Sequence, residues 1–184
     1  MTVLTGQLLI SMPQLQDPFF ARSVVYLCSH SQEDGAMGLI VNKTVDGLTI
    51  GELYAQLEIE MVYPSDQPVH FGGPVATGHG FMLHSADYRA EGTLGISVEF
   101  AMTATRDILV AKGRGAGPRQ SLLALGYAGW GPGQLDAEIQ ANSWLVVDAD
   151  TELVFALDDD SKWQRALAKL GISPEMLSGE SGRA

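Results

Sequence analysis

The sequence has a single cysteine, Cys28, among its 184 residues. One thiol cannot form a disulfide within the chain, and a cysteine-rich zinc site needs several thiolates, so both are excluded. No run approaches the roughly 18 apolar residues that a membrane-spanning helix needs. The N-terminal sequence MTVLTGQLLISMPQL lacks the basic and long apolar regions of a secretory signal. We therefore expect a cytoplasmic protein that does not enter a membrane.

Basic residues are scarce. The chain has 11 lysines and arginines against 22 aspartates and glutamates, which gives a formal net charge of −11 at pH 7. A negative field of this kind repels phosphate backbones, so direct binding to nucleic acid is disfavoured. One local basic segment lies between Arg106 and Arg119, where four basic residues accompany one aspartate.

Familiar catalytic motifs are also missing: the chain has no GxSxG elbow, no HExxH zinc motif and no Walker loop. Its four histidines, His30, His70, His79 and His84, have no carboxylate or thiolate cluster at a metal-ligand spacing. We expect no metal and no cofactor. Cys28 and His30 would share one face of a predicted strand, but apolar neighbours favour Cys28 as a buried side chain over a nucleophile. Whether the protein is an enzyme stays open, with a non-catalytic role favoured.

Strands and helices occur in separate clusters, without the alternation that a doubly wound sheet requires. Strands are predicted in GQLLISM, SVVYLCSH and AMGLIVNK, with QEDG as the turn between an antiparallel pair. Further strands are expected within PVHFGGPVATGHGFMLHS, GISVEF, WLVVDA and LVFAL. The prediction is one α+β domain over residues 1–184, in which residues 172–184 form a frayed tail.

Helices are predicted from apolar periodicity and capping residues. Thr49 is an N-cap candidate for LTIGELYAQL, and Gly113 is the expected end of TATRDILVAKG. A third helix is predicted to begin at Pro118 and to continue through GYAGW. DDDSKWQRALAKLG predicts a final helix. Gln134–Ala141 fits both strand alternation and a helix face, and we favour a short helix.

The stretch LGYAGWGPGQL, residues 125–135, concentrates glycine. It contains no lysine or arginine, and its spacing is not that of a phosphate-binding loop. We interpret it as a joint, in which Gly126 and Gly129 let a helix pack closely and residues 131–133 turn the chain. The glycines of GGPV, residues 72–75, indicate a turn or bulge that a β-carbon would obstruct.

Four polar residues are candidates for a ligand or anion pocket: Arg22, His30, Asn42 and His84. Arg22 follows the apolar PFFA and precedes a predicted central strand, where a guanidinium group needs a carboxylate or carbonyl partner. A buried structural ion pair is our first interpretation of Arg22. A ligand contact made together with His30 and Asn42 is the alternative.

The segment KGRGAGPR is a second anion candidate. Lys112, Arg114 and Arg119 accompany a glycine-rich backbone that leads into a predicted helix start, a combination that can bind an anion. Its glycine spacing matches no nucleotide-binding motif, so an exposed flexible loop is the preferred interpretation.

Three blocks of sequence resemble the signature of the bacterial AlgH/YqgE family: residues 6–43, 69–84 and 123–145. The resemblance implies an α+β fold whose sheet curls toward a pseudo-barrel, with four to five helices around it. It also implies a bacterial cytosolic protein with no established activity or cofactor, and an association with the regulation of alginate synthesis. The residues that we assign to the structural signature are Gly72, Gly73, Pro74, Gly126, Gly129, Trp130 and Gly133.

Two functions remain possible at this stage. The first is a regulatory or interaction protein that acts through an unidentified protein partner. The second is a small-molecule-binding or hydrolase-like protein with its pocket at the four candidate residues. The sequence does not define an oligomeric state, and we assume a monomer.

Overall fold

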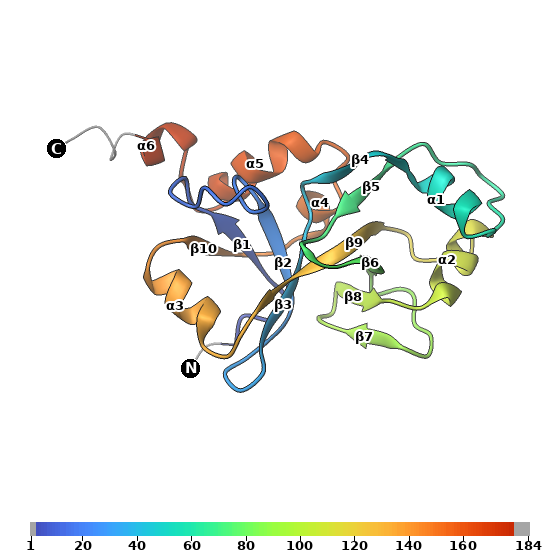
Figure 1. The fold of residues 1–184 in the computed structure, drawn as a ribbon, viewed down its shortest axis with the longest axis horizontal. Helices are drawn as coiled ribbons and strands as arrows, with labels where there is room; N and C mark the ends of the chain where they lie inside the picture. Colours follow the sequence, from blue (N-terminus) through green and yellow to red (C-terminus); the bar gives the residue numbers. More distant parts are fainter. Residues whose placement is uncertain (1–2, 179–184) are drawn as a thin grey trace.

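The computed structural model describes residues 3–178. Ten strands form one largely antiparallel sheet that curls into part of a barrel, and helices pack around it, so the predicted α+β class is confirmed (Figure 1). The strands are β1 (Gln7–Ser11), β2 (Val24–Ser31), β3 (Gly35–Ile40), β4 (Thr44–Thr49), β5 (Pro68–Phe71), β6 (Val75–Ser85), β7 (Thr93–Gly95), β8 (Phe100–Thr103), β9 (Ser121–Trp130) and β10 (Trp144–Asp148). The helices are α1 (Ile50–Gln56), α2 (Arg106–Gly113), α3 (Gln134–Gln140), α4 (Thr151–Val154), the 3-10 turn η1 (Asp159–Ser161), α5 (Lys162–Ala168) and α6 (Pro174–Ser178).

The strand order is β10-β1-β2-β3-β9-β6-β8-β7. β5 pairs in parallel with β9, and β4 pairs with β5. Helices α1 and α2 lie at one end of the molecule, α3 and α6 lie toward the other, and α5 lies above the middle (Figure 1). Strand β9 passes between these two ends and is bonded to β3, β5 and β6.

The N-terminal predictions are confirmed. β2 and β3 form the expected antiparallel pair, in which Ser31 lies opposite Gly35. Thr49 caps α1: its hydroxyl accepts a hydrogen bond from the Glu52 N–H, and the Glu52 carboxylate accepts one from the Thr49 N–H. This reciprocal capping box stabilises the first turn of a short helix. The short helix that we favoured at Gln134–Ala141 is also present, as α3.

The helix predicted from Pro118 is wrong, because residues 121–130 form strand β9. Every second residue from Leu122 to Trp130 is buried, as the period of a strand requires. Small residues at Ala124, Gly126 and Ala128 weakened this alternation as a sequence signal. Gly129 is exposed in the strand and does not pack against a helix.

Three other expectations are corrected. LVFAL is not a strand, because α4 covers residues 151–154. GISVEF is a bend between β7, which ends at Gly95, and β8, which begins at Phe100. Within the expected frayed tail, α6 is helical and Ile172 and Leu177 pack against the core. Residues 179–184 lie outside the described residues.

The signature glycines bring two backbones together. Gly126 has φ +77° and Gly73 has φ +153°, conformations that favour glycine. A β-carbon on Gly126 would overlap the Gly73 carbonyl oxygen, and one on Gly72 would overlap the Gly126 carbonyl oxygen. The Gly72 N–H donates to the Leu125 carbonyl oxygen at 2.9 Å. The prediction that a β-carbon would be obstructed at GGPV is therefore confirmed. The obstruction arises because the backbone of residues 72–73 lies against the backbone of β9.

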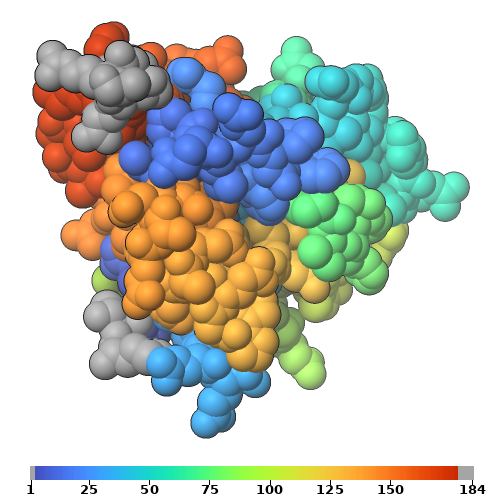
Figure 2. All heavy atoms as spheres, turned by 60° about the vertical axis from the view of Figure 1, so that its left-hand side comes forward, coloured from blue at the N-terminus to red at the C-terminus, as the bar shows by residue number. Residues whose placement is uncertain are grey.

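Two large apolar clusters lie on opposite faces of β2. One contains Tyr26 and Cys28, and the other contains Val25 and Leu27. The segment between β1 and β2, blue in Figure 2, lies beside α3 on the outer surface. There the Met12 N–H donates to the carbonyl oxygen of Ser143. A third, smaller cluster lies beneath α1 and α2.

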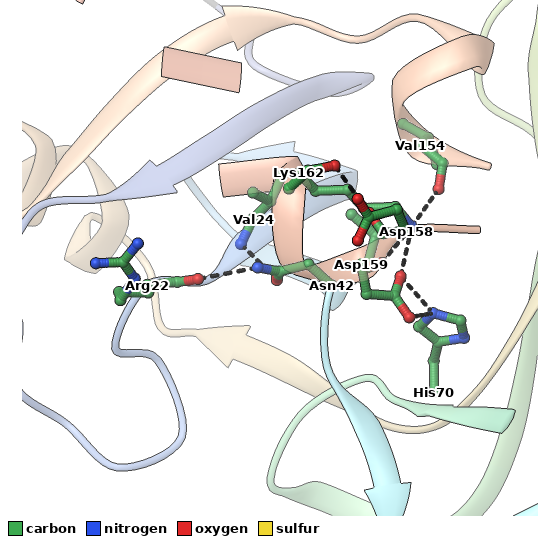
Figure 3. A network of polar contacts seen from close by, with 10 residues as sticks. Arg22, Val24, Asn42, His70, Val154, Asp158, Asp159 and Lys162 are labelled. Atoms are coloured by element: carbon green, nitrogen blue, oxygen red, sulfur yellow. Dashed lines mark hydrogen bonds and ion pairs between the residues drawn. The ribbon is translucent and has the colours of Figure 1, made fainter. Parts of the chain in front are cut away.

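The ammonium group of Lys162 is fully buried and holds the C-terminal helices on the sheet. Its Nζ donates to the carbonyl oxygens of Val41 at 2.8 Å and Val154 at 2.9 Å, and it lies 2.8 Å from Asp159 Oδ1. The same carboxylate lies 2.9 Å from His70 Nε2 in β5 (Figure 3). Burial lowers the pKa of Lys162, and the ion pair with Asp159 acts against this effect. The network therefore joins α5 to the residue after β3, to α4, to η1 and to β5.

Replacing Lys162 by methionine should lower the free energy of unfolding by about 3 kcal/mol, because it leaves buried acceptors without their donor. Urea unfolding measures this change. Lys169→Met is the matched control: Lys169 Nζ lies 2.6 Å from Asp150 Oδ2 in a partly exposed pair, which should contribute at most about 1 kcal/mol. Equal, small losses in both variants would show that the buried network does not hold the fold.

Candidate functional site

An open groove of about 740 Å³ lies where strands β2 and β9 end and β3 begins, beside β7. We call it the strand-end groove. Met37, Tyr127 and Trp130 contribute to its wall, and Val75 and Leu94 are apolar residues on it that stay 40% and 46% exposed. Apolar side chains are therefore available to a bound molecule without any change in the fold.

Charge in the strand-end groove is sparse and negative. Asp34 is its carboxylate, and among the described residues no lysine or arginine lines it. The Asp34 N–H donates to the Ser31 hydroxyl at 2.9 Å, which fixes the tight turn between β2 and β3. A cationic group is a better match for this surface than an anion.

A β-bulge separates Cys28 from His30. The register of β2 against β3 shifts between Leu27 and Ser29, so the simple alternation of side chains is interrupted. Cys28 belongs to the cluster around Tyr26, whereas His30 lies opposite Ala36, a member of the other cluster. The expectation that Cys28 and His30 share a face is therefore wrong.

Neither group is arranged as a nucleophile or its base. Burial raises the pKa of the Cys28 thiol to about 12, so the thiol is protonated at neutral pH, and its interpretation as a buried apolar side chain is confirmed. His30 Nδ1 accepts a hydrogen bond from the Leu4 N–H at 3.1 Å. His30 Nε2 lies 3.5 Å from Asp136 Oδ1 and makes no hydrogen bond within the described residues.

Arg22 and Asn42 lie together at the start of β2. The Asn42 amide donates to the Arg22 carbonyl oxygen and accepts from the Val24 N–H, both at 2.9 Å (Figure 3). The Arg22 guanidinium lies 4.3 Å from the ring centroid of Trp163, which is a cation–π contact. Arg22 is exposed and has no ion pair within the described residues, so the buried ion pair that we first expected is wrong.

His84 is fully buried in β6, and its partners fix its tautomer. Nδ1 donates to the Ser85 carbonyl oxygen at 2.8 Å, so Nε2 accepts from the Thr103 hydroxyl at 2.8 Å. The Thr103 hydroxyl oxygen lies 2.8 Å from that of Thr93, which extends the network to β7. Burial lowers the pKa of His84, although the hydrogen bond to Ser85 and the charge of Asp87 oppose it.

The four candidate residues do not form one pocket. Arg22 and Asn42 interact at the start of β2, His30 lies near its end, and His84 binds β8 from β6. Only His30 lines the strand-end groove. Each of these residues is held by different hydrogen-bond partners. Their shared polar character in the sequence was therefore not enough to predict a common site.

The structure of the basic segment KGRGAGPR also differs from the prediction. Because β9 replaces the helix expected at Pro118, no helix terminus faces this loop from that side. Lys112 lines a hollow of about 320 Å³, whereas Arg114 and Arg119 are exposed outside it. The Arg119 N–H donates to Asp87 Oδ2 at 3.1 Å. The three basic residues therefore do not converge.

Sequence reasoning missed two features of the site region. Tyr127 and Trp130 were assigned to a helix, yet they line the strand-end groove. The sequence signal for this strand was weak, because small residues occupy several of its alternate positions. The His70–Asp159 contact joins positions 89 apart in the chain, and no local pattern predicts it.

The lowered pKa of His84 predicts a specific pH dependence. In the unfolded chain the pKa of His84 is about 6.5, and in the folded chain it is lower, so the unfolded chain takes up the proton first as the pH falls. The stability that depends on neutral His84 is therefore fully present above about pH 6.5 and is lost as the pH falls below that value. The loss is at most about 1.4 kcal/mol per pH unit for one proton. His84→Gln should flatten this part of the stability curve, as measured by urea unfolding between pH 5 and 8. The exposed His79→Gln serves as control, and an unchanged curve in His84→Gln would contradict the assignment.

Comparison with known sequences gives a consistent result. The chain matches the AlgH-like family model over residues 8–175. It is 52% identical to a UPF0301 protein of Cereibacter sphaeroides over 183 residues, with 98% of this chain and 99% of that protein covered. It is 53% identical to a UPF0301 protein of Ruegeria pomeroyi over 184 residues, with 98% and 99% covered.

Solved structures agree with these matches. The solution structure of the AlgH protein from Pseudomonas aeruginosa has a TM-score of 0.79 and 39% identity, covering 100% of this chain and 97% of that one. A crystal structure of a Corynebacterium diphtheriae protein has a TM-score of 0.73 at 21% identity, covering 98% and 92%, and shows similarity of fold alone. The chain therefore belongs to the AlgH-like family of UPF0301 proteins.

Proposed function

We propose that the protein is a cytoplasmic regulatory or interaction protein, and that a segment of a protein partner docks in the strand-end groove. The observation that carries this proposal is the groove itself, which is open, has apolar residues at Val75 and Leu94, and holds a carboxylate without lysine or arginine among the described lining residues. A segment with apolar and basic side chains would match it. The net charge of −11 would favour the approach of such a segment.

The proposal rests on binding and not on catalysis. The buried Cys28 thiol is protonated at neutral pH, given its pKa of about 12. The Thr103 hydroxyl is hydrogen-bonded to His84, and both side chains are buried, so this pair is part of the internal hydrogen-bond network between β6 and β8. The alternative pocket formed by Arg22, His30, Asn42 and His84 has no support, because these residues bind separate partners.

Docking also offers a physical means for the regulatory association that the resemblance to AlgH implies. A partner held in the groove would have its activity changed by contact, without a reaction on this chain and without direct contact with nucleic acid. The link to alginate synthesis would then be indirect, through that partner.

No helix among residues 3–178 has the length and apolarity to cross a membrane.

Leu94→Lys should reduce recovery of the partner at least tenfold, because it places a positive charge in an acidic, apolar groove that is proposed to receive cationic side chains. The measurement is affinity capture from native cells, quantified by mass spectrometry beside the wild type. Val62→Lys is the matched control, because Val62 is 54% exposed and lies outside the groove. Equal recovery by Leu94→Lys and the wild type would contradict docking at this site.

A further inference from the structure

A second cavity, of about 230 Å³, lies between helices α1 and α2 and the sheet. We call it the inter-helix cavity. It shares no lining residue with the strand-end groove. The buried side chains of Met82, Ile108 and Leu123 line the cavity. The same three residues make up the smallest of the three apolar clusters. Because Thr103, Thr105 and Arg106 also line it, the cavity suits an occupant with an apolar body and one polar end.

An irregularity of β6 lies beside the cavity. Val75 lies opposite Tyr127 of β9, but the next paired residue, Gly80, lies opposite Leu125. Five steps along β6 therefore accompany two steps along β9, so residues 76–79 leave the ladder. Gly80 and Leu125 both line the cavity.

Arg106 provides the positive charge at the mouth of the inter-helix cavity. It is exposed, and its Nη2 donates to the Leu57 carbonyl oxygen at 2.8 Å. This bond uses one of the five N–H donors of a guanidinium group. Arg106 forms no ion pair with any described carboxylate. A carboxylate ligand at the mouth would provide an acceptor for the other donors.

We propose that the inter-helix cavity binds a small amphipathic carboxylate, with its apolar body on Met82, Ile108 and Leu123 and its carboxylate at Arg106. Cavity size limits the ligand. A cavity of roughly 150 Å³ takes benzene, so 230 Å³ holds about ten non-hydrogen atoms. Drug-sized ligands need roughly 300–1,000 Å³. A medium-chain fatty acid has the required size and polarity. This site is independent of the docking function proposed for the strand-end groove.

Titration of the full chain with sodium octanoate tests the proposal, with amide chemical shifts as the readout. Octanoate should shift the amides of Met82, Ile108 and Leu123 in a saturable way, with a dissociation constant of about 1 mM or tighter. The amides of the strand-end groove should not shift. Absence of saturable shifts at octanoate concentrations about tenfold above that value would overturn the proposal.

Gly80→Leu tests the apolar half of the site. A β-carbon on Gly80 would lie 3.8 Å from Leu123 and 3.9 Å from Leu125, which are ordinary contacts, so the new side chain can fill the cavity. Octanoate binding should disappear while the spectrum stays dispersed. Unchanged binding in a folded Gly80→Leu variant would show that octanoate binds elsewhere.

Arg106→Gln tests the charged half, and because Arg106 is exposed this variant remains informative even if Gly80→Leu does not fold. Octanoate should bind about tenfold more weakly, whereas the affinity for uncharged 1-octanol should change less than about twofold. The control Arg114→Gln removes a charge from the other end of α2, outside the cavity, and should change neither affinity. Equal weakening of octanoate and 1-octanol by Arg106→Gln would overturn carboxylate recognition.

Discussion

Strand β9 can bond to three other strands only because its backbone meets that of residues 72–73 without β-carbons between them. It pairs with β3 near its C-terminal end, with β5 and β6 nearer its N-terminal end, and it carries Gly126 at positive φ between these regions. A side chain at Gly126 or Gly73 would meet main-chain atoms, which cannot move as a flexible side chain can. This contact therefore fixes where the end of β5 and the start of β6 lie against β9.

Both proposed sites use the same strand. Tyr127 and Trp130 line the strand-end groove, whereas Leu123 and Leu125 line the inter-helix cavity. The groove is open and acidic, which suits a segment of a partner. The cavity is smaller, apolar and flanked by helices, which suits a small molecule.

Local chemistry made part of this fold predictable. The β2–β3 turn and the Thr49 N-cap depend on residues within a few positions of each other, and both were predicted from the sequence, whereas the reciprocal bond from Glu52 was not. Strand β9 was mistaken for a helix because Gly126 interrupts its apolar pattern, and glycine has no side chain to report which face is buried. The Lys162–Asp159–His70 network and the dispersal of the four candidate residues depend on distant strand pairings, which no single sequence window records.

The stability of Gly126→Ala tests the central role of β9 most directly. Alanine at this φ is strained and its β-carbon meets the Gly73 carbonyl oxygen, so we expect a loss of at least about 2 kcal/mol. Urea unfolding should be followed by tryptophan fluorescence, which reports Trp130, Trp144 and Trp163 together, and by the amide signals of α2. The account predicts that both signals change together at a lower urea concentration than in the wild type. Unchanged stability, or separate unfolding of the two ends, would contradict it.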